Sequence, residues 1–450
     1  MLTNTFFSEY KRKLVSADEA VKIVKSGDWV DYVGYQAQAF SLDRALARRK
    51  DELNDIKIRS ILRMKNIPEV IKVDPEQKHF IYNSWHFSSI ERKLADHGAC
   101  YYAPILLREV SDYYEQYVDV DVAIVVTSPM DRHGFFNFGL QNSFTRAVLE
   151  KAKFIIIEVN EAMPRVFGGN EEHIHISEVD YVVEGGSWSI PTTGDTPTTE
   201  VDNKIARFIV NELQDGSCIQ LGIGGMPNAV GKLIADSDLK DLGVHTEMFC
   251  DAYLNMYRAG KITGRKKTID RGKMTFSFAL GSQDLYDFVN ENPICASYPA
   301  SYTNKPHNIA KNDRAVAINN ALEIDLFGQV CSESVGTRHI SGTGGQVDFC
   351  EGAFMSREGK SFICLSSTYT DKKGICNSRI KPVHIPGAIV TTPRTIVMYV
   401  VTEYGIVNLK GKSTWERAEA LISIAHPNFQ DELVKEAEKM KIWRRTNKRN

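Results

Sequence analysis

Residues 203–230, NKIARFIVNELQDGSCIQLGIGGMPNAV, contain the elements that decide the fold. The stretch Asn203–Leu213 has helical spacing of apolar residues, Asp215–Gly216 is a turn, and Cys218–Leu221 is short and apolar like a buried strand. Three glycines follow, and a second helix is expected to begin near Pro227 because proline is favoured in a first turn. Helix, strand, glycine turn and helix in this order predict an α/β protein with a mostly parallel sheet.

The first half of the chain shows the same order of elements. A capping box at Ser16–Glu19 predicts a helix through about Lys25, which is followed by a turn at Gly27–Asp28, a strand at Trp29–Val33 and then Gly34. Further predicted elements are the strands Val120–Val126 and Phe154–Val159 and the helix Ser143–Ala152 between them. The parallel with Cys218–Gly222 predicts an internal duplication: two similar α/β lobes with a ligand cleft between them.

A stretch rich in Gly, Pro, Ser and Thr, Gly185–Thr199, has no helical or strand periodicity. Such a composition is typical of a linker between domains. The sequence therefore predicts an N-terminal α/β domain over residues 1–190 and a C-terminal α/β domain over residues 200–450.

The composition is that of an ordinary globular protein, with 450 residues, 43% hydrophobic, 25% charged and 10% aromatic. This excludes a disordered, collagen-like or coiled-coil chain. The 55 Lys and Arg against 57 Asp and Glu leave a net charge of −2, so no general positive field attracts nucleic acid or an anionic membrane. Only Lys439–Arg449 is locally basic, and we interpret it as a solvated end. No apolar run approaches the roughly 18 residues of a membrane-spanning helix.

The cysteines and the N-terminus indicate the compartment. Eight scattered cysteines form no CxxC pair and several lie in apolar runs, which is typical of free thiols in the cytoplasm. The apolar patch in Met1–Tyr10 precedes Lys11–Lys13, the reverse of the order in a signal peptide. We therefore expect a cytoplasmic protein.

Two glycine clusters are candidate binding sites. Gly222–Pro227 follows a predicted strand and Ser341–Gln346 follows the apolar alternation at Ala315–Phe327. Glycine turns and helix N-termini bind phosphates, carboxylates or a developing oxyanion through backbone N–H groups. Neither cluster is a GxGxxG or Walker motif. A tight strand-to-helix turn for the first cluster and a flexible loop for the second remain the alternatives.

The carboxylate of Glu247 lies in an apolar context, HTEMFC at 245–250. A buried carboxylate needs a partner or a function, so Glu247 is either a salt-bridged strand residue or a catalytic group. His245 and Glu247 resemble the H-x-E of zinc deaminases, but the Pro-Cys-x-x-Cys is missing, and Glu171–His175 lacks the HExxH pattern. No GxSxG is present. We therefore predict neither a metal site nor a serine nucleophile.

Taken together, the motifs resemble the acetyl-CoA hydrolase/transferase family, the class I CoA-transferases, and within it most closely the butyryl-CoA:acetate and 4-hydroxybutyrate CoA-transferases. The resemblance covers nearly the whole chain. In the second half it rests on Gly222–Val230, His245–Met248, Gly328–Gly336, Ser341–Phe349 and Val400–Gly405, and in the first half on Ser128–Gly139, Glu158–Pro164 and His175–Asp180.

The resemblance implies a CoA-transferase-like fold of two α/β lobes and a catalytic role for Glu247. In this role the carboxylate attacks an acyl-CoA thioester and forms an acyl-glutamyl anhydride and then a glutamyl-CoA thioester. It implies that the backbone N–H groups of Ile223 and Gly345 form the oxyanion hole. The implied CoA-binding residues are Gly222, Ile223, Gly224, Gly225, Met226, Pro227, Ser341, Gly345 and Lys360. Glu403 is either a second carboxylate near the site or a structural partner.

The activity that the resemblance implies is CoA transfer between an acyl-CoA and acetate, with butyryl-CoA as the expected donor and 4-hydroxybutyryl-CoA and propionyl-CoA as alternatives. An acyl-CoA hydrolase that uses the same glutamate is the second hypothesis, and a non-catalytic CoA-binding protein is the third. The expected partners are acyl-CoA and short-chain carboxylates, without nucleic acid, membrane, metal or prosthetic group. We expect a homodimer or a higher homo-oligomer. The aromatic segments Tyr35–Phe40 and Trp85–Phe87 either line the acyl pocket or belong to the core.

Overall fold

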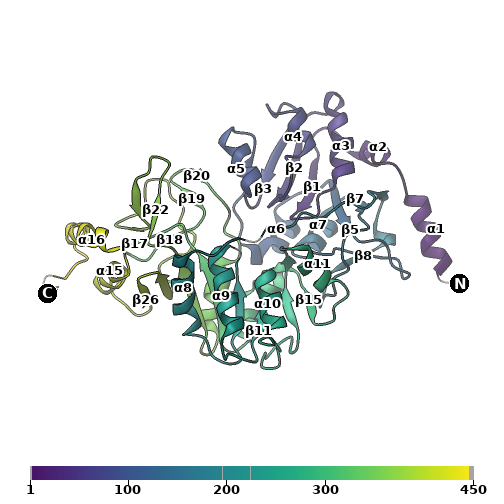
Figure 1. Cartoon of the computed structure of the whole chain (residues 1–450). Helices are drawn as coiled ribbons and strands as arrows, with labels where there is room; N and C mark the ends of the chain where they lie inside the picture. The colour runs from purple at the N-terminus through teal and green to yellow at the C-terminus, as the bar shows by residue number, and fades with distance from the viewer. Residues whose placement is uncertain (1–2, 195, 223, 445–450) are drawn as a thin grey trace. The chain divides into compact units, whose positions relative to one another are not determined.

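The computed structural model describes residues 3–194, 196–222 and 224–444 and the order of their helices and strands (Figure 1). The chain divides into two compact units. The first consists of Met1–Gly194, Glu247–Phe249 and Thr275–Thr303, and the second of Asp195–Thr246, Cys250–Met274 and Asn304–Asn450.

This division differs from two contiguous domains. The expected linker does end the first long segment, but residues 247–249 and 275–303 pack with the first unit. The Tyr286 hydroxyl donates to the Pro191 carbonyl at 2.8 Å, and the Thr193 N–H donates to the Gly281 carbonyl at 3.0 Å. Glu247 thus belongs to the first unit, although we expected it in the C-terminal domain.

In the first unit, a seven-stranded parallel sheet has the order β4-β3-β2-β1-β5-β7-β9. Its strands are β1 (Trp29–Gly34), β2 (Ile56–Ile61), β3 (Phe80–Ser84), β4 (Tyr101–Tyr102), β5 (Val122–Thr127), β7 (Phe154–Val159) and β9 (Tyr181–Glu184). All six residues of β5 are buried, as expected for a central strand that is covered on both faces.

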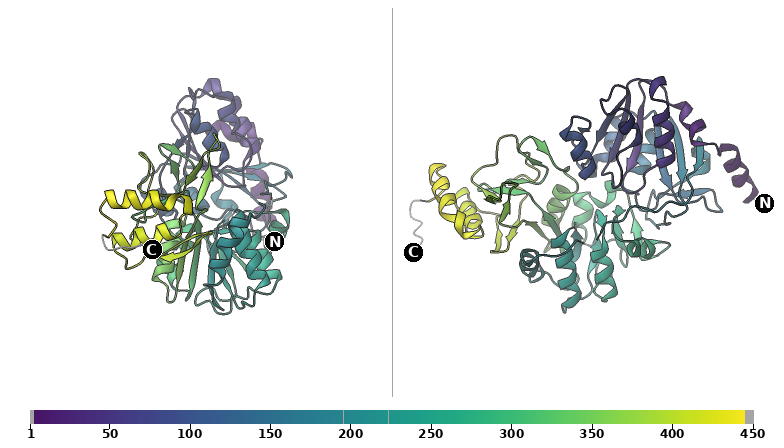
Figure 2. Two further views of the ribbon diagram at one scale, coloured as in Figure 1. Left: turned by 60° about the vertical axis from the view of Figure 1, so that its left-hand side comes forward. Right: turned by 45° about the horizontal axis from the view of Figure 1, so that its top comes forward.

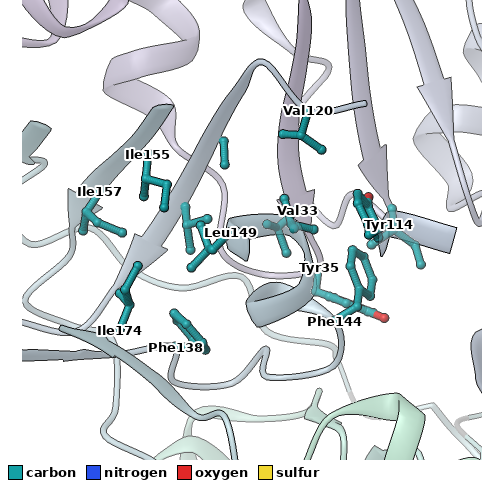
Figure 3. Packing of buried hydrophobic residues seen from close by; sticks show 14 of the residues in the cluster. Val33, Tyr35, Tyr114, Val120, Phe138, Phe144, Leu149, Ile155, Ile157 and Ile174 are labelled. Carbon is teal, nitrogen blue, oxygen red and sulfur yellow. The ribbon is translucent and has the colours of Figure 1, made fainter. Parts of the chain in front are cut away.

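The first unit contains nine α-helices among its described residues. They are α1 (Thr3–Lys13), α2 (Ala17–Ala20), α3 (Phe40–Arg48), α4 (Glu69–Val73), α5 (Ser89–Asp96), α6 (Val110–Gln116), α7 (Thr145–Lys151), α11 (Gln283–Val289) and α12 (Ala300–Thr303). Aliphatic strand residues such as Val33 and Ile157 pack with Leu149 of α7 and with the rings of Tyr35 and Phe144 in one buried cluster (Figure 3). Two short ladders join β6 (Phe135–Asn137) to β8 (His173–His175) and β12 (Met248–Phe249) to β14 (Phe278–Ala279).

In the second unit, six strands follow the order β11-β10-β16-β21-β25-β26, and all neighbours are parallel except β25 and β26. They are β10 (Cys218–Leu221), β11 (Gly243–His245), β16 (Ala315–Asn320), β21 (Lys360–Cys364), β25 (Tyr399–Thr402) and β26 (Gly405–Asn408). The order β11-β10-β16-β21-β25 repeats β2-β1-β5-β7-β9 of the first unit. The predicted pair of similar α/β lobes is therefore confirmed.

Helices α8 (Glu200–Val210), α9 (Gly225–Asp236) and α10 (Asp251–Arg258) lie in a row on one face of this sheet (Figure 1). The remaining helices of the second unit are α13 (Pro306–Ala310), α14 (Gln346–Met355), α15 (Thr414–Ser423) and α16 (Pro427–Lys439), of which α15 and α16 lie side by side (Figure 2). Small antiparallel pairs are β17 (Glu323–Asp325) with β18 (Val330–Cys331), β19 (Ser334–Val335) with β20 (Arg338–His339), and β22 (Thr368–Thr370) with β23 (Cys376–Ser378), while β24 (Ile380–Lys381) pairs parallel with β17.

The predicted strands Phe154–Val159 and Cys218–Leu221 agree with the structure residue for residue. The helix expected from Ser16 is shorter than predicted. The Ser16 hydroxyl does accept from the Glu19 N–H at 3.2 Å, but α2 ends at Ala20 and continues only as a 3₁₀ turn to Ile23. The predicted linker contains neither helix nor strand at its described residues.

Candidate functional site

The loop Gly222–Pro227 connects β10 to α9, and two of its glycines face open space. Gly224, the N-cap of α9, has φ 117°, a backbone conformation that glycine adopts without strain. A Cβ atom on Gly222 or Gly224 would meet no heavy atom of the described residues within 4 Å. The backbone here is therefore open to a ligand at the N-terminus of a helix. Ile223, a predicted oxyanion donor, lies outside the described residues.

Other residues of this loop hold it in place. A Cβ on Gly225 would come within 2.7 Å of Asp202 Oδ2 in α8, so this glycine permits close packing of two helices. Met226 and Pro227 are buried in the first turn of α9. Their side chains pack inside the unit, so the structure assigns the open surface of the loop to Gly222 and Gly224.

Side chains of α10 and of its N-cap residue Cys250 contact the end of β10, the strand before the loop. The Tyr253 hydroxyl accepts a hydrogen bond from the Leu221 N–H at 2.5 Å, and the Cys250 thiol lies 3.6 Å from the Gly222 carbonyl oxygen. Because Tyr253 is fully buried, its pKa is raised, and the phenol stays neutral. The end of β10 is thus held on both sides of the point where the glycines begin.

The second glycine cluster leads into α14. The Ser341 hydroxyl donates to the Ser332 carbonyl at 3.0 Å, Gly344 has φ 53°, and Gly345 is the N-cap of the helix. The side-chain Nε2 of Gln346 in the first turn is buried and has no hydrogen-bond partner among the described residues. This loop therefore presents backbone and side-chain N–H groups at a helix N-terminus.

Both clusters lie at the carboxyl end of the second unit's parallel strands. Gly222 follows the last residue of β10, and α14 begins after Gly345 and runs back toward the start of β21. The chain goes from β10 to β11 on one side and to β16 on the other, so β10 and β16 form the topological switch point of the sheet. Ligands bind in open α/β sheets at such a point, outside the carboxyl ends of the strands.

Glu247 follows β11 by two residues, and its main chain is fixed within the first unit. The Glu247 carbonyl accepts hydrogen bonds from the Ser277 N–H at 2.8 Å and from the Phe278 N–H at 3.1 Å. The next two residues form β12, which pairs with β14, and Phe249 stacks on Phe276 with ring centroids 4.8 Å apart. Glu247 itself is partly exposed, so it combines an anchored backbone with a side chain that solvent reaches.

Tyr35, which the sequence assigns either to a wall of the acyl pocket or to the core, lies in the buried hydrophobic cluster of the first unit. It is 2% exposed, in the loop after β1. Burial raises the pKa of its phenol, and the charge of Glu247 raises it further, while the hydrogen bond with Ser143 lowers it. No sequence motif connects residues 35 and 247, and only the fold brings them into electrostatic range. Trp85 of the second aromatic segment belongs to the core, where its Nε1–H donates to the Tyr114 hydroxyl at 3.1 Å.

Lys360 does not lie at the glycine loops, although we expected it among the CoA-binding residues. Its Nζ binds the Glu212 carboxylate at 2.6 Å and the Glu212 carbonyl at 3.0 Å. Glu212 follows the carboxyl end of α8, whereas the glycine loop packs against Asp202 at the other end of that helix. The structure therefore does not bring Lys360 to the glycine loops, and we remove it from the expected CoA-binding residues.

Glu403 has a structural partner. The Ser367 N–H donates to one oxygen of the Glu403 carboxylate at 2.8 Å, and the Ser367 hydroxyl donates to the other at 2.6 Å. These bonds join the end of β25 to the loop before β22. Of the two roles left open by the sequence, this geometry supports the structural one.

The described residues contain no group of three or more His, Cys, Asp or Glu side chains arranged to hold a metal ion. His173 is exposed on β8 and contacts Phe135, and the ring nitrogen Nδ1 of His175 pairs with Ser177 at 2.7 Å. Within the same described part of the chain, no helix combines the length and apolar character needed to cross a lipid bilayer.

The fold and the loops together define a class of protein: an α/β protein whose glycine turns present backbone N–H groups at the switch point of a parallel sheet, where ligands of such sheets bind. The chain belongs to the acetyl-CoA hydrolase/transferase family. Residues 3–192 match the family's N-terminal domain and residues 281–437 its C-terminal domain.

Individual relatives support this assignment. The chain is 53% identical over 446 residues to the butyryl-CoA:acetate CoA-transferase of Anaerostipes caccae, covering 99% of this chain and 100% of the relative. It is 55% identical over 441 residues to the probable butyrate:acetyl-CoA coenzyme A-transferase of Syntrophomonas wolfei, with 98% of each chain covered. The crystal structure of RipA from Yersinia pestis has a TM-score of 0.89 and 34% identity, covering 97% of this chain and 99% of that chain.

Proposed function

We propose that this protein transfers CoA from butyryl-CoA to acetate, with Glu247 as the covalent nucleophile. The observation that carries the proposal is the similarity to the Anaerostipes caccae enzyme, at 53% identity over 99% of this chain and 100% of that enzyme. The geometry of the glycine loops supports it, because open backbone at helix N-termini suits the carbonyl and phosphate oxygens of an acyl-CoA.

The proposed reaction has two halves. A Glu247 carboxylate oxygen attacks the thioester carbonyl, the C–S bond breaks, and the CoA thiolate leaves a butyryl-glutamyl anhydride. The thiolate then attacks the glutamyl carbonyl carbon, the C–O bond breaks, and butyrate departs from a glutamyl-CoA thioester. Acetate attacks this thioester to form an acetyl-glutamyl anhydride, and the released thiolate attacks the acetyl carbon. The products are acetyl-CoA and the free Glu247 carboxylate.

The anchored main chain of Glu247 suits this role. Two hydrogen bonds hold its carbonyl and the ladder of β12 with β14 holds the residues after it, so the carboxylate is presented from a fixed backbone. The family resemblance assigns the oxyanion to the N–H groups of Ile223 and Gly345, where each donor contributes about 3–4 kcal/mol. The position of Gly345 as the N-cap of α14 supports its role as an oxyanion donor.

The setting of the reaction belongs to the same proposal. All eight cysteines are free thiols and seven are buried, which suits a reducing compartment, so we place the enzyme in the cytoplasm. It needs no prosthetic group, because the nucleophile, the thiolate and the acceptor carboxylate supply every bond that forms or breaks. It acts as a homodimer or a larger homo-oligomer.

Mass spectrometry tests the nucleophile. The protein is mixed with butyryl-CoA, with and without borohydride, and its peptides are analysed. A CoA adduct on the peptide that contains Glu247, reducible by borohydride to an alcohol, is the expected result. Glu247→Gln should abolish the adduct, whereas the control Glu403→Gln should retain it. An adduct on another peptide, or none with bound butyryl-CoA, contradicts the proposal.

Acetate dependence separates the transferase from a hydrolase. With butyryl-CoA alone, the enzyme should stop after the first half-reaction, at the glutamyl-CoA thioester, and acetate should start continuous formation of acetyl-CoA. Release of free CoA at the same rate with and without acetate would show a hydrolase that uses water as the acceptor.

A further inference from the structure

Tyr35 has an unusual backbone and a well-defined environment. It follows Gly34 at the end of β1 and has φ 56°, a conformation that costs a non-glycine residue about 1–3 kcal/mol and persists only where the surroundings fix it. Its ring stacks on Phe278 with centroids 4.3 Å apart, and its hydroxyl oxygen lies 3.0 Å from Ser143 Oγ. Figure 3 shows Tyr35 beside Phe144 in the buried cluster, where their ring centroids are 6.1 Å apart.

Phe278 and Ser143, the two residues that contact the ring and the hydroxyl of Tyr35, are both linked by main-chain hydrogen bonds to Glu247. Phe278, which carries the stacked ring, donates its N–H to the Glu247 carbonyl at 3.1 Å. The N–H of Ser143 donates to the Ser277 carbonyl at 3.0 Å, and the N–H of Ser277 donates to the Glu247 carbonyl at 2.8 Å. Tyr35 is therefore connected to Glu247 by two separate routes, through its ring and through its hydroxyl partner.

The side chain of Gln36, the residue after Tyr35, also contacts β14. The side-chain Nε2 of Gln36 donates to the Ala279 carbonyl, and the Ala279 N–H donates to the Leu140 carbonyl at 2.9 Å. Phe278 and Ala279 form β14, which pairs with Met248 and Phe249 directly after Glu247. The loop after β1 thus clamps the strand that positions Glu247.

Burial is the main cause of the raised pKa of Tyr35 and keeps the phenol neutral, and the charge of the Glu247 carboxylate raises this pKa further. Where the Ser143 hydroxyl is the donor in their hydrogen bond, the phenolic hydrogen is available for a second acceptor. A neutral O–H dipole near a carboxylate stabilises the charged form of that carboxylate.

The position of Tyr35 in the fold supports a role in the site. The strand order places β1 in the first unit where β10 lies in the second. The loop after β10 contains Gly222 and Gly224, and the loop after β1 contains Gly34 and Tyr35. The two loops therefore occupy corresponding switch points, where α/β sheets bind ligands.

We propose that Tyr35 is a positioning residue for Glu247: its ring holds β14 and through it Glu247, and its hydroxyl, held by Ser143, orients and stabilises the Glu247 carboxylate. This inference rests on the proposed role of Glu247 as the nucleophile. It adds a residue from the other end of the first unit's sequence to the machinery of the reaction.

Tyr35→Phe tests the hydroxyl while keeping the stacked ring. The rate of adduct formation with butyryl-CoA should fall about ten- to thirtyfold, because the hydroxyl held by Ser143 no longer orients the attacking carboxylate, while KM stays within about twofold. The acid limb of the pH–rate profile should move upward by about one pH unit, because the Glu247 carboxylate has a higher pKa without the neutral hydroxyl dipole near it.

Tyr32→Phe is the matched control, because Tyr32 is also buried and donates its hydroxyl to Asp43 at 3.2 Å. It should lower thermal stability without moving the acid limb. Ser143→Ala should reproduce part of the Tyr35→Phe effect, and the double variant should be no slower than Tyr35→Phe alone, because both remove the same arrangement. Additive effects would overturn the inference.

The two proposals fail in distinguishable ways. If the wild-type adduct does not map to Glu247, the proposed nucleophile is wrong whatever Tyr35→Phe does. If the adduct maps to Glu247 and the folded Tyr35→Phe variant keeps the wild-type rate and acid limb, only the role of Tyr35 is overturned.

Discussion

Gly34 lies so close to Ile61 that a Cβ atom on the glycine would come within 2.2 Å of the Ile61 carbonyl oxygen. Its φ of 135° is also unfavourable for any side chain. Gly34→Ala should therefore destabilise the protein by more than about 3 kcal/mol or prevent folding, as a thermal melt would show. The control Gly27→Ala, at φ 90° with no described atom within 4 Å, should cost only about 1–2 kcal/mol. Equal losses for the two variants would contradict the close approach at Ile61.

Gly222 gives the opposite prediction for stability. A Cβ atom added to Gly222 would meet no described atom within 4 Å, and the φ of Gly222 lies outside the left-handed region. Gly222→Ala should therefore change the free energy of unfolding by less than about 0.5 kcal/mol. The new methyl group should block the approach of CoA and raise KM for butyryl-CoA about tenfold. Gly194→Ala, at another glycine with the same freedom, is the control. An unchanged KM for Gly222→Ala would remove this glycine from the proposed CoA site.

The structural role assigned to Glu403 predicts a change in stability without loss of the covalent intermediate. Because both carboxylate oxygens accept from Ser367, Glu403→Gln should lower the free energy of unfolding by about 1–3 kcal/mol. The CoA adduct on Glu247 should still form, and Ser367→Ala should produce a similar loss of stability. A stable Glu403→Gln variant that forms no adduct would instead place this carboxylate in the chemistry.

Lys360 should not contribute to CoA binding. Its ammonium group is paired with Glu212 at 2.6 Å, and the two side chains are 23% and 35% exposed. Lys360→Met should change KM for butyryl-CoA by less than twofold and stability by at most about 1 kcal/mol. A large rise in KM, measured by steady-state kinetics, would restore Lys360 to the site.

His384 should make the stability of the second unit depend on pH. Its Nδ1 lies 2.7 Å from Glu323 and its Nε2 lies 3.0 Å from the Gln329 carbonyl, so both ring nitrogens face acceptors. Burial opposes protonation, but the Glu323 hydrogen bond and the Asp325 charge outweigh it and raise the pKa of His384. A raised pKa means stabilisation that is fully present below the unfolded value of about 6.5 and is lost as the pH rises through the folded value.

The melting temperature should therefore fall between pH 6 and pH 8.5 by more in the wild type than in His384→Gln. His307→Gln, at an exposed position on α13, serves as the control and should follow the wild type. Parallel pH curves for the wild type and His384→Gln would show that the imidazolium does not stabilise the fold.

The extent to which sequence predicted this structure depends on the range of the interactions involved. Phe154–Val159 is a largely apolar, β-branched segment, and such local information suffices to place the strand. The helix after Ser16 begins as its capping box predicts, but it ends at Ala20. Ala20 and Val21 are fully buried, and the local sequence pattern shows neither this burial nor the early end of the helix. The duplication could be predicted because both halves place a helix, a turn, a strand and a glycine in the same order, whereas the shared strand order is seen only in the structure.

The functional residues divide in the same way. Gly222 and Glu247 lie in motifs that can be recognised along the chain, so sequence identified them. The partner of Lys360 lies 148 residues away, and that of Glu403 lies 36 residues away, so no local pattern shows their ion pair and hydrogen bonds. Tyr35 is connected to Glu247 only through Phe278 and Ser143, contacts that exist only after folding.

The interleaved division of the chain also constrains how the protein is made. The core of the first unit includes Phe278, Leu280 and Ala300 in addition to residues before the linker. On a ribosome, this core stays incomplete for about 110 residues after Gly194 has been added, which takes roughly 5–20 s at common rates of synthesis. During this interval the nascent first unit exposes an apolar surface that only its own later residues can cover. A stop codon in the linker would therefore release an aggregation-prone fragment instead of a folded half-protein.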